Sequence, residues 1–369
     1  MRKLGSVEER KGQPQNAIRW FHRAAAQIPA RTRNRTWLAT RADVRLAEAG
    51  VLARQDDNAT CVRIADEALW DARRAHDDAA IALALERKHL GLVGLMEIDR
   101  DGVGLRALAA HRERGDHNGM ARTLINLGVE AYFESRWSDA AAHYLEALDA
   151  AERAGSVVLA ANAAINSAEV LCDQGSWQRA LELFDGATRN YNAVGYTPGA
   201  AATSLFSSVA AMRDGDLAGA QQRLAHARHE IERLEMEFLG DLRSRELELE
   251  VLQGIATLEG CADALESSRD DPMLTARAVR CRAGVYLEAG DIRLALDDLE
   301  QLLADYPTPD FERANALRLT ARIAPHDTRT PSWNEESATI YKRLGVTQAP
   351  PLTAADVSDH QTEVPGAGK

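Results

Sequence analysis

Hydrophobic residues along the chain recur three to four positions apart, which is the spacing of amphipathic helices and not of strands. The segments 124–155 and 164–195 align at a step of 40 residues, and a third such segment begins at Ser204. Each segment reads as two helices joined by a short polar turn, at 134–136, 173–176 and 213–216. This pattern predicts an all-α chain of repeated helix pairs.

The same kinds of side chain return at the same columns of successive repeats. The shared columns are Gly128, Ala168 and Ser208; Ala140, Ala180 and Ala220; Tyr144, Phe184 and Leu224; Ala147, Ala187 and Ala227; and Trp137 with Trp177. Small residues let the two helices of a pair approach, and the large residue fills the groove between pairs. Because a single helix pair cannot bury its apolar faces, we expect successive helix pairs to stack on one another.

The spacing resembles the tetratricopeptide repeat, whose signature places small and large apolar residues at fixed offsets. The matching positions are Leu4, Gly5, Gly12, Ala17, Phe21, Ala24 and Pro29 near the start, and Ala283, Tyr286, Gly290, Ala295, Leu299 and Pro307 near the end. The resemblance implies a right-handed α-solenoid of about eight helix-turn-helix repeats with a C-terminal capping helix.

The predicted repeat array covers residues 1–346. Pro325 and Pro331 interrupt the pattern before a capping helix at 332–346, and the polar, Pro-rich segment 347–369 is predicted to be a disordered tail. The first helix has no matching cap, so its edge is expected to be frayed, to bind a partner or to continue a larger protein. The best-matching repeats are 1–31, 118–155, 158–195, 198–235 and 273–307.

Charge and composition narrow the class of partner. The chain carries 44 Lys and Arg against 56 Asp and Glu, a net charge of −12, so it lacks the basic surface that nucleic acids and acidic membranes need. It has no apolar run long enough to span a membrane and no signal-peptide pattern. The four cysteines are isolated, which fits reduced thiols. We expect a cytoplasmic protein.

The sequence offers little catalytic chemistry. No phosphate-binding loop or nucleophile-elbow motif is present, and the glycines at 91–94 and 102–104 lack a strand context. The segment 99–102 resembles the start of a calcium loop but lacks the later ligands. His226 and His229 are three residues apart on a helix without a third converging ligand. We therefore expect no enzyme, no cofactor and no metal.

A candidate binding surface follows from the first helices of the repeats. Asn126 and Asn166 share a column, Arg122 and Asn162 share the column one turn earlier, and Phe206 follows in the third repeat. Stacked amides can hydrogen-bond the backbone of an extended peptide, and the resemblance implies that role for Asn at this column. Phe206 replaces a cationic residue there, which argues against a carboxylate clamp. The alternative is that these amides only cap local backbone.

A finer resemblance concerns function. The stretch 122–155, the repeats that follow it and the final Ile-Tyr-Lys-Arg-Leu-Gly-Val are similar to the C-terminal repeat region of actinobacterial adenylate/guanylate cyclase–AAA ATPase or LuxR-type regulators. This implies a non-catalytic interaction scaffold, the sensing or docking part of a bacterial signalling or transcription-regulation system. The alternatives are a free-standing receptor for a peptide or small ligand, or a divergent enzyme. The expected partner is a protein or peptide, and the oligomeric state is not assigned.

Overall fold

The computed structural model describes residues 1–357 except 12, 235, 237, 270 and 309. Within these residues the chain forms helices, α1 to α18, and no strands, so the predicted all-α class is confirmed. The chain divides into two compact units, Met1–Ala163 (unit 1) and the part from Ala164 onward (unit 2). Helix α9 (Val157–Asp173) contains the division.

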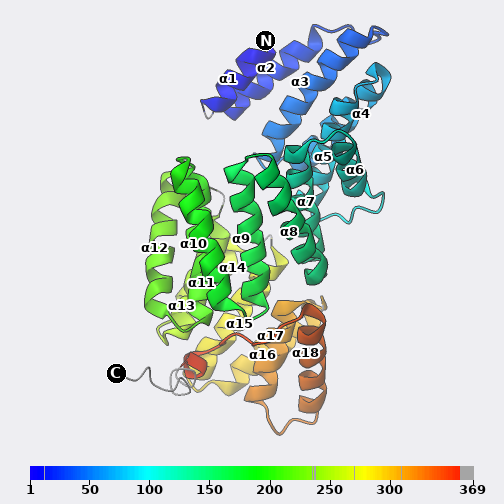
Figure 1. Ribbon diagram of the computed structural model, residues 1–369. Helices are drawn as coiled ribbons and strands as arrows, with labels where there is room; N and C mark the ends of the chain where they lie inside the picture. The colour runs from blue at the N-terminus through cyan, green and yellow to red at the C-terminus, as the bar shows by residue number, and fades with distance from the viewer. Residues whose placement is uncertain (12, 235, 237, 270, 309, 358–369) are drawn as a thin grey trace. The chain divides into compact units, whose positions relative to one another are not determined.

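Unit 1 is a succession of antiparallel helix pairs, in which each helix packs on the next along the chain (Figure 1). The first helix of each pair is odd-numbered and the second is even-numbered. Its helices before α9 are α1 (Arg2–Arg10), α2 (Pro14–Ala26), α3 (Arg35–Ala53), α4 (Asn58–Ala75), α5 (Asp78–Gly94), α6 (Val103–Glu113), α7 (His117–Phe133) and α8 (Trp137–Arg153).

Unit 2 continues the same pairing to the end of the described chain. Its helices after α9 are α10 (Trp177–Ala193), α11 (Thr197–Arg213), α12 (Leu217–Arg233), α13 (Leu239–Leu252), α14 (Leu258–Ser267), α15 (Pro272–Glu288), α16 (Ile292–Asp305), α17 (Phe311–Ile323) and α18 (Thr330–Leu344). In the described part of the chain, none of the helices has both the length and the hydropathy needed to cross a membrane.

Local signals set the helix ends. The carboxylates of Asp77 and Asp116 accept hydrogen bonds from the third residue beyond them, Ala80 N at 3.0 Å and Gly119 N at 2.9 Å, and so begin α5 and α7. After α8, Gly155 has a φ of 65°, a left-handed conformation that glycine adopts without strain. The helix pairs are therefore delimited by residues readable in the sequence.

The repeat columns are the packing positions of the fold. The small column of Ala140, Ala180 and Ala220 is fully buried, and so are the large residues of the next column, Tyr144, Phe184 and Leu224, at 3% exposure or less. Gly128 shows why a small residue is needed at its column: a Cβ atom there would lie 2.2 Å from the ring of Tyr144. The predicted column pattern is confirmed at these positions.

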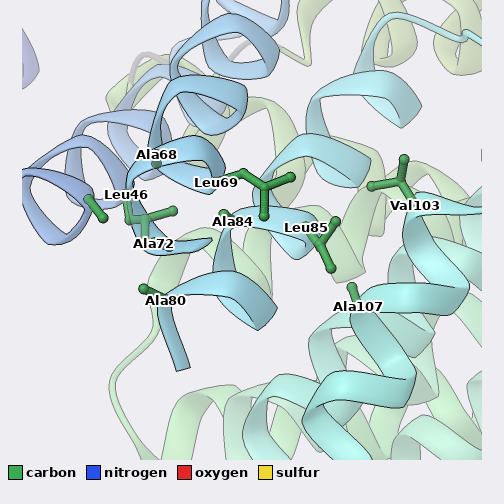
Figure 2. Packing of buried hydrophobic residues seen from close by; sticks show 10 residues of the cluster. Leu46, Ala68, Leu69, Ala72, Ala80, Ala84, Leu85, Val103 and Ala107 are labelled. Carbon is green, nitrogen blue, oxygen red and sulfur yellow. The ribbon is translucent and has the colours of Figure 1, made fainter. Parts of the chain in front are cut away.

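The less regular repeats pack by the same rule. Figure 2 shows a cluster between α3, α4, α5 and α6 in which large residues such as Leu69 and Leu85 lie among alanines such as Ala68 and Ala84. Alternating large and small side chains lets neighbouring helices approach closely while the apolar surface is buried. The segments 36–75 and 79–115 therefore form helix pairs although they match the repeat signature weakly.

The capping helix predicted at 332–346 is confirmed as α18, which begins at Thr330 and packs on α17. One prediction about the C-terminal end needs correction. The predicted disorder from residue 347 does not hold for 347–357, because Leu352 and Val357 are buried there and 354–357 forms a helical turn. Residues 358–369 lie outside the described residues.

Candidate functional site

The predicted binding residue Arg122 is held by a buried carboxylate in unit 1. Its guanidinium donates to both oxygens of Glu86, on α5, at 2.7 and 2.9 Å. His111, on α6, places Nε2 3.2 Å from Glu86 Oε2. Arg122 remains one-third exposed. The side chain is thus fixed in place with one edge open to a ligand.

The charge of this group is stable. Burial alone would raise the pKa of Glu86, but hydrogen bonds from His111 and Arg122 lower it to about 2. The carboxylate is therefore ionised at neutral pH and keeps Arg122 oriented. Arg87, next to it, has its pKa lowered by burial.

The asparagine positions lie at the border between core and solvent. Asn126, on α7, and Asn162, on α9, are both half-buried residues of unit 1. Asn162 already takes part in an interaction. An amide in this position can keep one edge for a partner while its stem packs on the helix. Their role in binding stays a prediction.

The other two predicted residues belong to unit 2. Asn166, on α9, is half-buried, and so is Phe206, on α11. The ring of Phe206 meets that of Phe238 edge to face at 6.0 Å between centroids. The five predicted residues thus divide between the units, with Arg122, Asn126 and Asn162 in unit 1, and each group is considered within its own unit.

A group that the sequence did not indicate lies between α5 and α7. Oxygen and nitrogen atoms of His89, Asp99 and Glu130 lie within 4.8 Å of one another, a set that could ligate a divalent cation. Their hydrogen bonds also support a purely structural role. Glu130 accepts from His89 and from the backbone N of Asp99, both at 3.1 Å, and Asp99 accepts from Gly104 N. The group ties the α5–α6 loop to α7.

The histidines weighed as metal ligands do not form such a group. His226 and His229 are both exposed on α12, and the nearest carboxylate to His229 is that of its neighbour Glu230 at 3.7 Å. Exposed i,i+3 side chains on one helix are ordinary surface residues.

Unit 2 contains a row of buried ion pairs on the odd-numbered helices α13, α15 and α17, and this row forms a charged wall. Glu248, on α13, pairs with Arg280, on α15, at 3.1 Å, and Arg280 pairs with Glu312, on α17, also at 3.1 Å. Glu312 also accepts from Arg277 at 2.8 Å. Burial would raise the pKa of Glu248, but Arg280 and Arg277 lower it to about 2. The carboxylate of Glu248 therefore stays ionised at neutral pH.

In the part of the chain that the structure describes, three guanidinium groups at this wall have N–H groups without a hydrogen-bond acceptor. Arg213 Nε, Arg245 Nε and Arg277 Nη1 are buried and make no hydrogen bond within the described residues. Such donors prefer a carbonyl or carboxylate oxygen. Nearby, burial raises the pKa of Glu169 to about 8, and the negative charge of Asp173 adds to the shift. At neutral pH this carboxyl is mostly protonated, so the wall is richer in positive charge than its residue list implies.

An extended segment of the chain itself lies against unit 2. Thr347 donates from its backbone N and from Oγ1 to the carbonyl of Gln174 at 2.8 Å, just after α9. Gln174 donates from Nε2 to the carbonyl of Leu344 at 3.0 Å. Arg318, on α17, donates to the carbonyl of Pro350. The backbone carbonyl of Gln174 and the side chain of Arg318 thus bind the irregular segment.

Comparison by sequence identifies no relative: no protein-family model matches the chain, and no curated protein matches it. Comparison by structure finds proteins of similar fold. A Rap protein complexed with Competence and Sporulation Factor is 13% identical, with a TM-score of 0.50, over 88% of this chain and 99% of that chain.

The apo form of RapI is also similar in structure. It is 12% identical, with a TM-score of 0.55, over 98% of this chain and 97% of that chain. At such low identity the likeness shows the fold alone. The chain therefore has a helical-repeat fold like that of the Rap proteins, and the predicted tetratricopeptide-like architecture is confirmed.

Proposed function

We propose that this protein is a non-catalytic interaction scaffold that binds a peptide or an extended protein segment on the first helices of its repeats. The observation that carries the proposal is the segment 347–357, whose backbone is held in unit 2 by the carbonyl of Gln174 and the side chain of Arg318. A surface that binds backbone groups in this way tolerates many sequences. This is the chemistry expected of a peptide-binding repeat protein.

Further support comes from the positive charge of unit 2. Among the described residues, Arg213, Arg245 and Arg277 have buried nitrogens without an acceptor, and their charge favours the carbonyl or carboxylate groups of a partner on the surface above them. One of the structurally similar Rap proteins was solved in complex with Competence and Sporulation Factor. That complex belongs to the Rap protein, and it motivates the same class of role here.

The residues Arg122, Asn126, Asn162, Asn166 and Phe206 belong to this proposal as partner contacts. Arg122 is oriented by Glu86, which leaves it suited to a carbonyl or carboxylate of a partner. We further propose that the scaffold is the docking or sensing part of a bacterial signalling or transcription-regulation system, which is the role implied by the resemblance read from the sequence alone.

A selection from a random peptide library displayed on phage, with the full chain as bait, tests the proposal. We expect enrichment of related peptides, and at least a tenfold loss of affinity in the double variant Asn126→Ala plus Asn166→Ala. The matched control is Asn190→Ala plus Asn192→Ala, because both asparagines are exposed on the second helix α10. Equal affinity of the test and control variants would reject the assigned surface, and no enrichment would reject the scaffold itself.

The alternative is a free-standing receptor. In this version the same surface binds a peptide or small ligand, and the protein does not dock onto a larger signalling protein. The two versions differ in what co-purifies with the full chain from the parent cell. A docking module retains a large signalling protein, whereas a receptor retains only a small molecule or peptide. Mass spectrometry of the purified complex distinguishes them.

A further inference from the structure

The segment 347–357 has the composition of a linker, yet several of its residues are buried. It contains the sequence Ala-Pro-Pro-Leu and leaves α18 after Gly345 (red in Figure 1). Proline favours an extended backbone and lowers the entropy lost on binding. Pro350, Pro351, Leu352 and Thr353 are all buried. An irregular segment therefore occupies a formed surface of unit 2.

One apolar side chain anchors the segment. Leu352 is 3% exposed and belongs to the hydrophobic cluster formed by α15, α16 and α17, which includes Leu299 and Leu319. Without Leu352 this cluster would present an apolar surface to solvent at its open edge. A single deep anchor with weaker contacts on either side is typical of a bound peptide.

Polar contacts fix the direction of the segment. At its start Thr347 bonds the carbonyl of Gln174, and at its end Asp356 pairs with Arg322, which also donates to Thr353 Oγ1 at 3.0 Å. Asp356 in turn accepts from the backbone N of Leu352 at 2.7 Å. The recognised pattern is therefore an extended Pro-Pro-Leu followed, four residues after the leucine, by a carboxylate.

The surface under the segment is made by several repeats. Gln174 follows α9, while Arg318 and Arg322 lie on α17. Gly175 lies directly beneath the segment, since a Cβ atom there would be 2.6 Å from Gln348 N. Gly254, just after α13, lies next to Ala354. The contacts thus come from residues just after α9 and α13 and from α17.

We propose that residues 347–357 are a built-in, exchangeable occupant of the unit 2 surface formed by Gln174, Arg318, Arg322 and the α15–α17 cluster, and that a peptide of the same chemistry displaces them. The inference rests on the proposed peptide-binding function and adds a regulatory step to it. Because the segment is covalently attached, its effective concentration is high. An external peptide therefore binds only when its intrinsic affinity or its concentration exceeds that of the attached segment.

The test uses the full chain and a fluorescent peptide of residues 347–357 added in trans. Leu352→Asp releases the attached segment because it places a charge in the apolar cluster, and Ala355→Asp is the matched control at an exposed position of the same segment. We expect the Leu352→Asp chain to bind the peptide at least tenfold more tightly than the wild type and the control. Hydrogen exchange at 347–357 should rise in the Leu352→Asp chain alone.

A second variant covers the case in which Leu352→Asp fails to fold. Asp356→Ala removes contacts of the attached segment with Arg322 and with the backbone N of Leu352, whereas the added peptide keeps its own Asp356, and we expect it to raise peptide binding about threefold. In the wild-type chain, excess peptide should speed hydrogen exchange at 347–357. Slow exchange that excess peptide and both variants leave unchanged would overturn the exchangeable occupant. Release of the segment without binding of this peptide also overturns it. The library selection then decides separately whether the scaffold function stands.

Discussion

Unit 1 and unit 2 bury charged side chains on similar helix pairs but balance them differently. In unit 1 the buried carboxylates are surrounded by cations: Asp71 accepts from Arg41 and Arg45, and Glu86 accepts from Arg122. In unit 2 the carboxylate Glu312 is shared between two buried arginines. Within the described residues, three buried arginine nitrogens of unit 2 make no hydrogen bond, whereas unit 1 has one such nitrogen, Arg87 Nε.

In both units a buried carboxylate lies between two guanidinium groups, Asp71 in unit 1 and Glu312 in unit 2, so these ion pairs chiefly hold helices together. Unit 2 differs in that, among the residues described, more of its buried guanidinium nitrogens lack an acceptor, which leaves this unit richer in positive charge. Unit 2 is also the unit in which a segment of irregular backbone is bound. The same repeat architecture thus buries ion pairs between helices in both units, and in unit 2 it also holds the segment 347–357.

The largest expected effect comes from removing the shared carboxylate. Glu312→Ala leaves Arg277 and Arg280 without their main partner in a dry site, and we expect a loss of ~3–5 kcal/mol in the free energy of unfolding. Glu86→Ala should cost clearly less, because Arg122 is partly exposed and can reach water. Urea unfolding of both variants measures the difference. As a control, Glu300→Ala removes an exposed pair with Arg329 and should cost ~0–1 kcal/mol.

Next in size is a test of the small column in the two units. Gly128→Val in unit 1 places side-chain atoms against the ring of Tyr144, and we expect a loss of ~1–3 kcal/mol from overpacking. In unit 2, Gly186 on α10 has open space around it, so Gly186→Ala should stabilise by ~0.5–1 kcal/mol through helix propensity. Thermal melts of the two variants should shift in opposite directions. Shifts of the same sign would contradict the packing role of Gly128.

A smaller effect should appear in the dependence of stability on pH. Glu86 has a folded pKa of about 2, below the unfolded value of about 4.3, so its stabilisation is present above pH ~4.3 and lost as pH falls toward 2. Glu169 has a folded pKa of about 8, so its stabilisation is present below pH ~4.3 and lost as pH rises through 8. Glu169→Gln should therefore raise the melting temperature at pH 8.5 by at least ~2 °C relative to the wild type, with little change at pH 4. Equal effects at both pH values would contradict the raised pKa.

The smallest expected effect on stability is at the predicted binding amides. Asn126 and Asn166 are half-buried, so alanine at either position should change the free energy of unfolding by no more than ~0.5 kcal/mol. The loss of binding proposed above would then be separable from unfolding. A larger destabilisation would show that these amides mainly satisfy local backbone groups, which is the alternative weighed from the sequence.

Much of the fold could be predicted because helix packing depends on side-chain size at fixed intervals. The columns at Ala140, Ala180 and Ala220 and the turn glycines are local features, and the structure confirms them. The end of the chain was less predictable. A segment such as Ala-Pro-Pro-Leu lacks helical periodicity and is ordinarily unstructured, and its burial depends on a surface formed by residues more than 150 positions earlier, at Gln174.

The candidate site was predictable only in part. The repeated Asn column can be found by alignment of the chain with itself, but the partner of Arg122 cannot, since Glu86 lies 36 residues earlier in a weakly matching repeat. The same holds for His89, Asp99 and Glu130, which are separated by loops of irregular length. The calcium-like pattern at 99–102 marked Asp99 as polar but gave no sign of its partners.

By itself the sequence determined that this protein is a stack of helix pairs, because apolar side chains at helical spacing must be buried and small residues at a regular interval allow only close, repeated packing. Only the tertiary structure decided which charges meet, which carboxyl group stays protonated and where the C-terminal segment binds. Those features depend on distances between residues far apart in the chain and on the exclusion of water around them, neither of which is encoded in a local pattern.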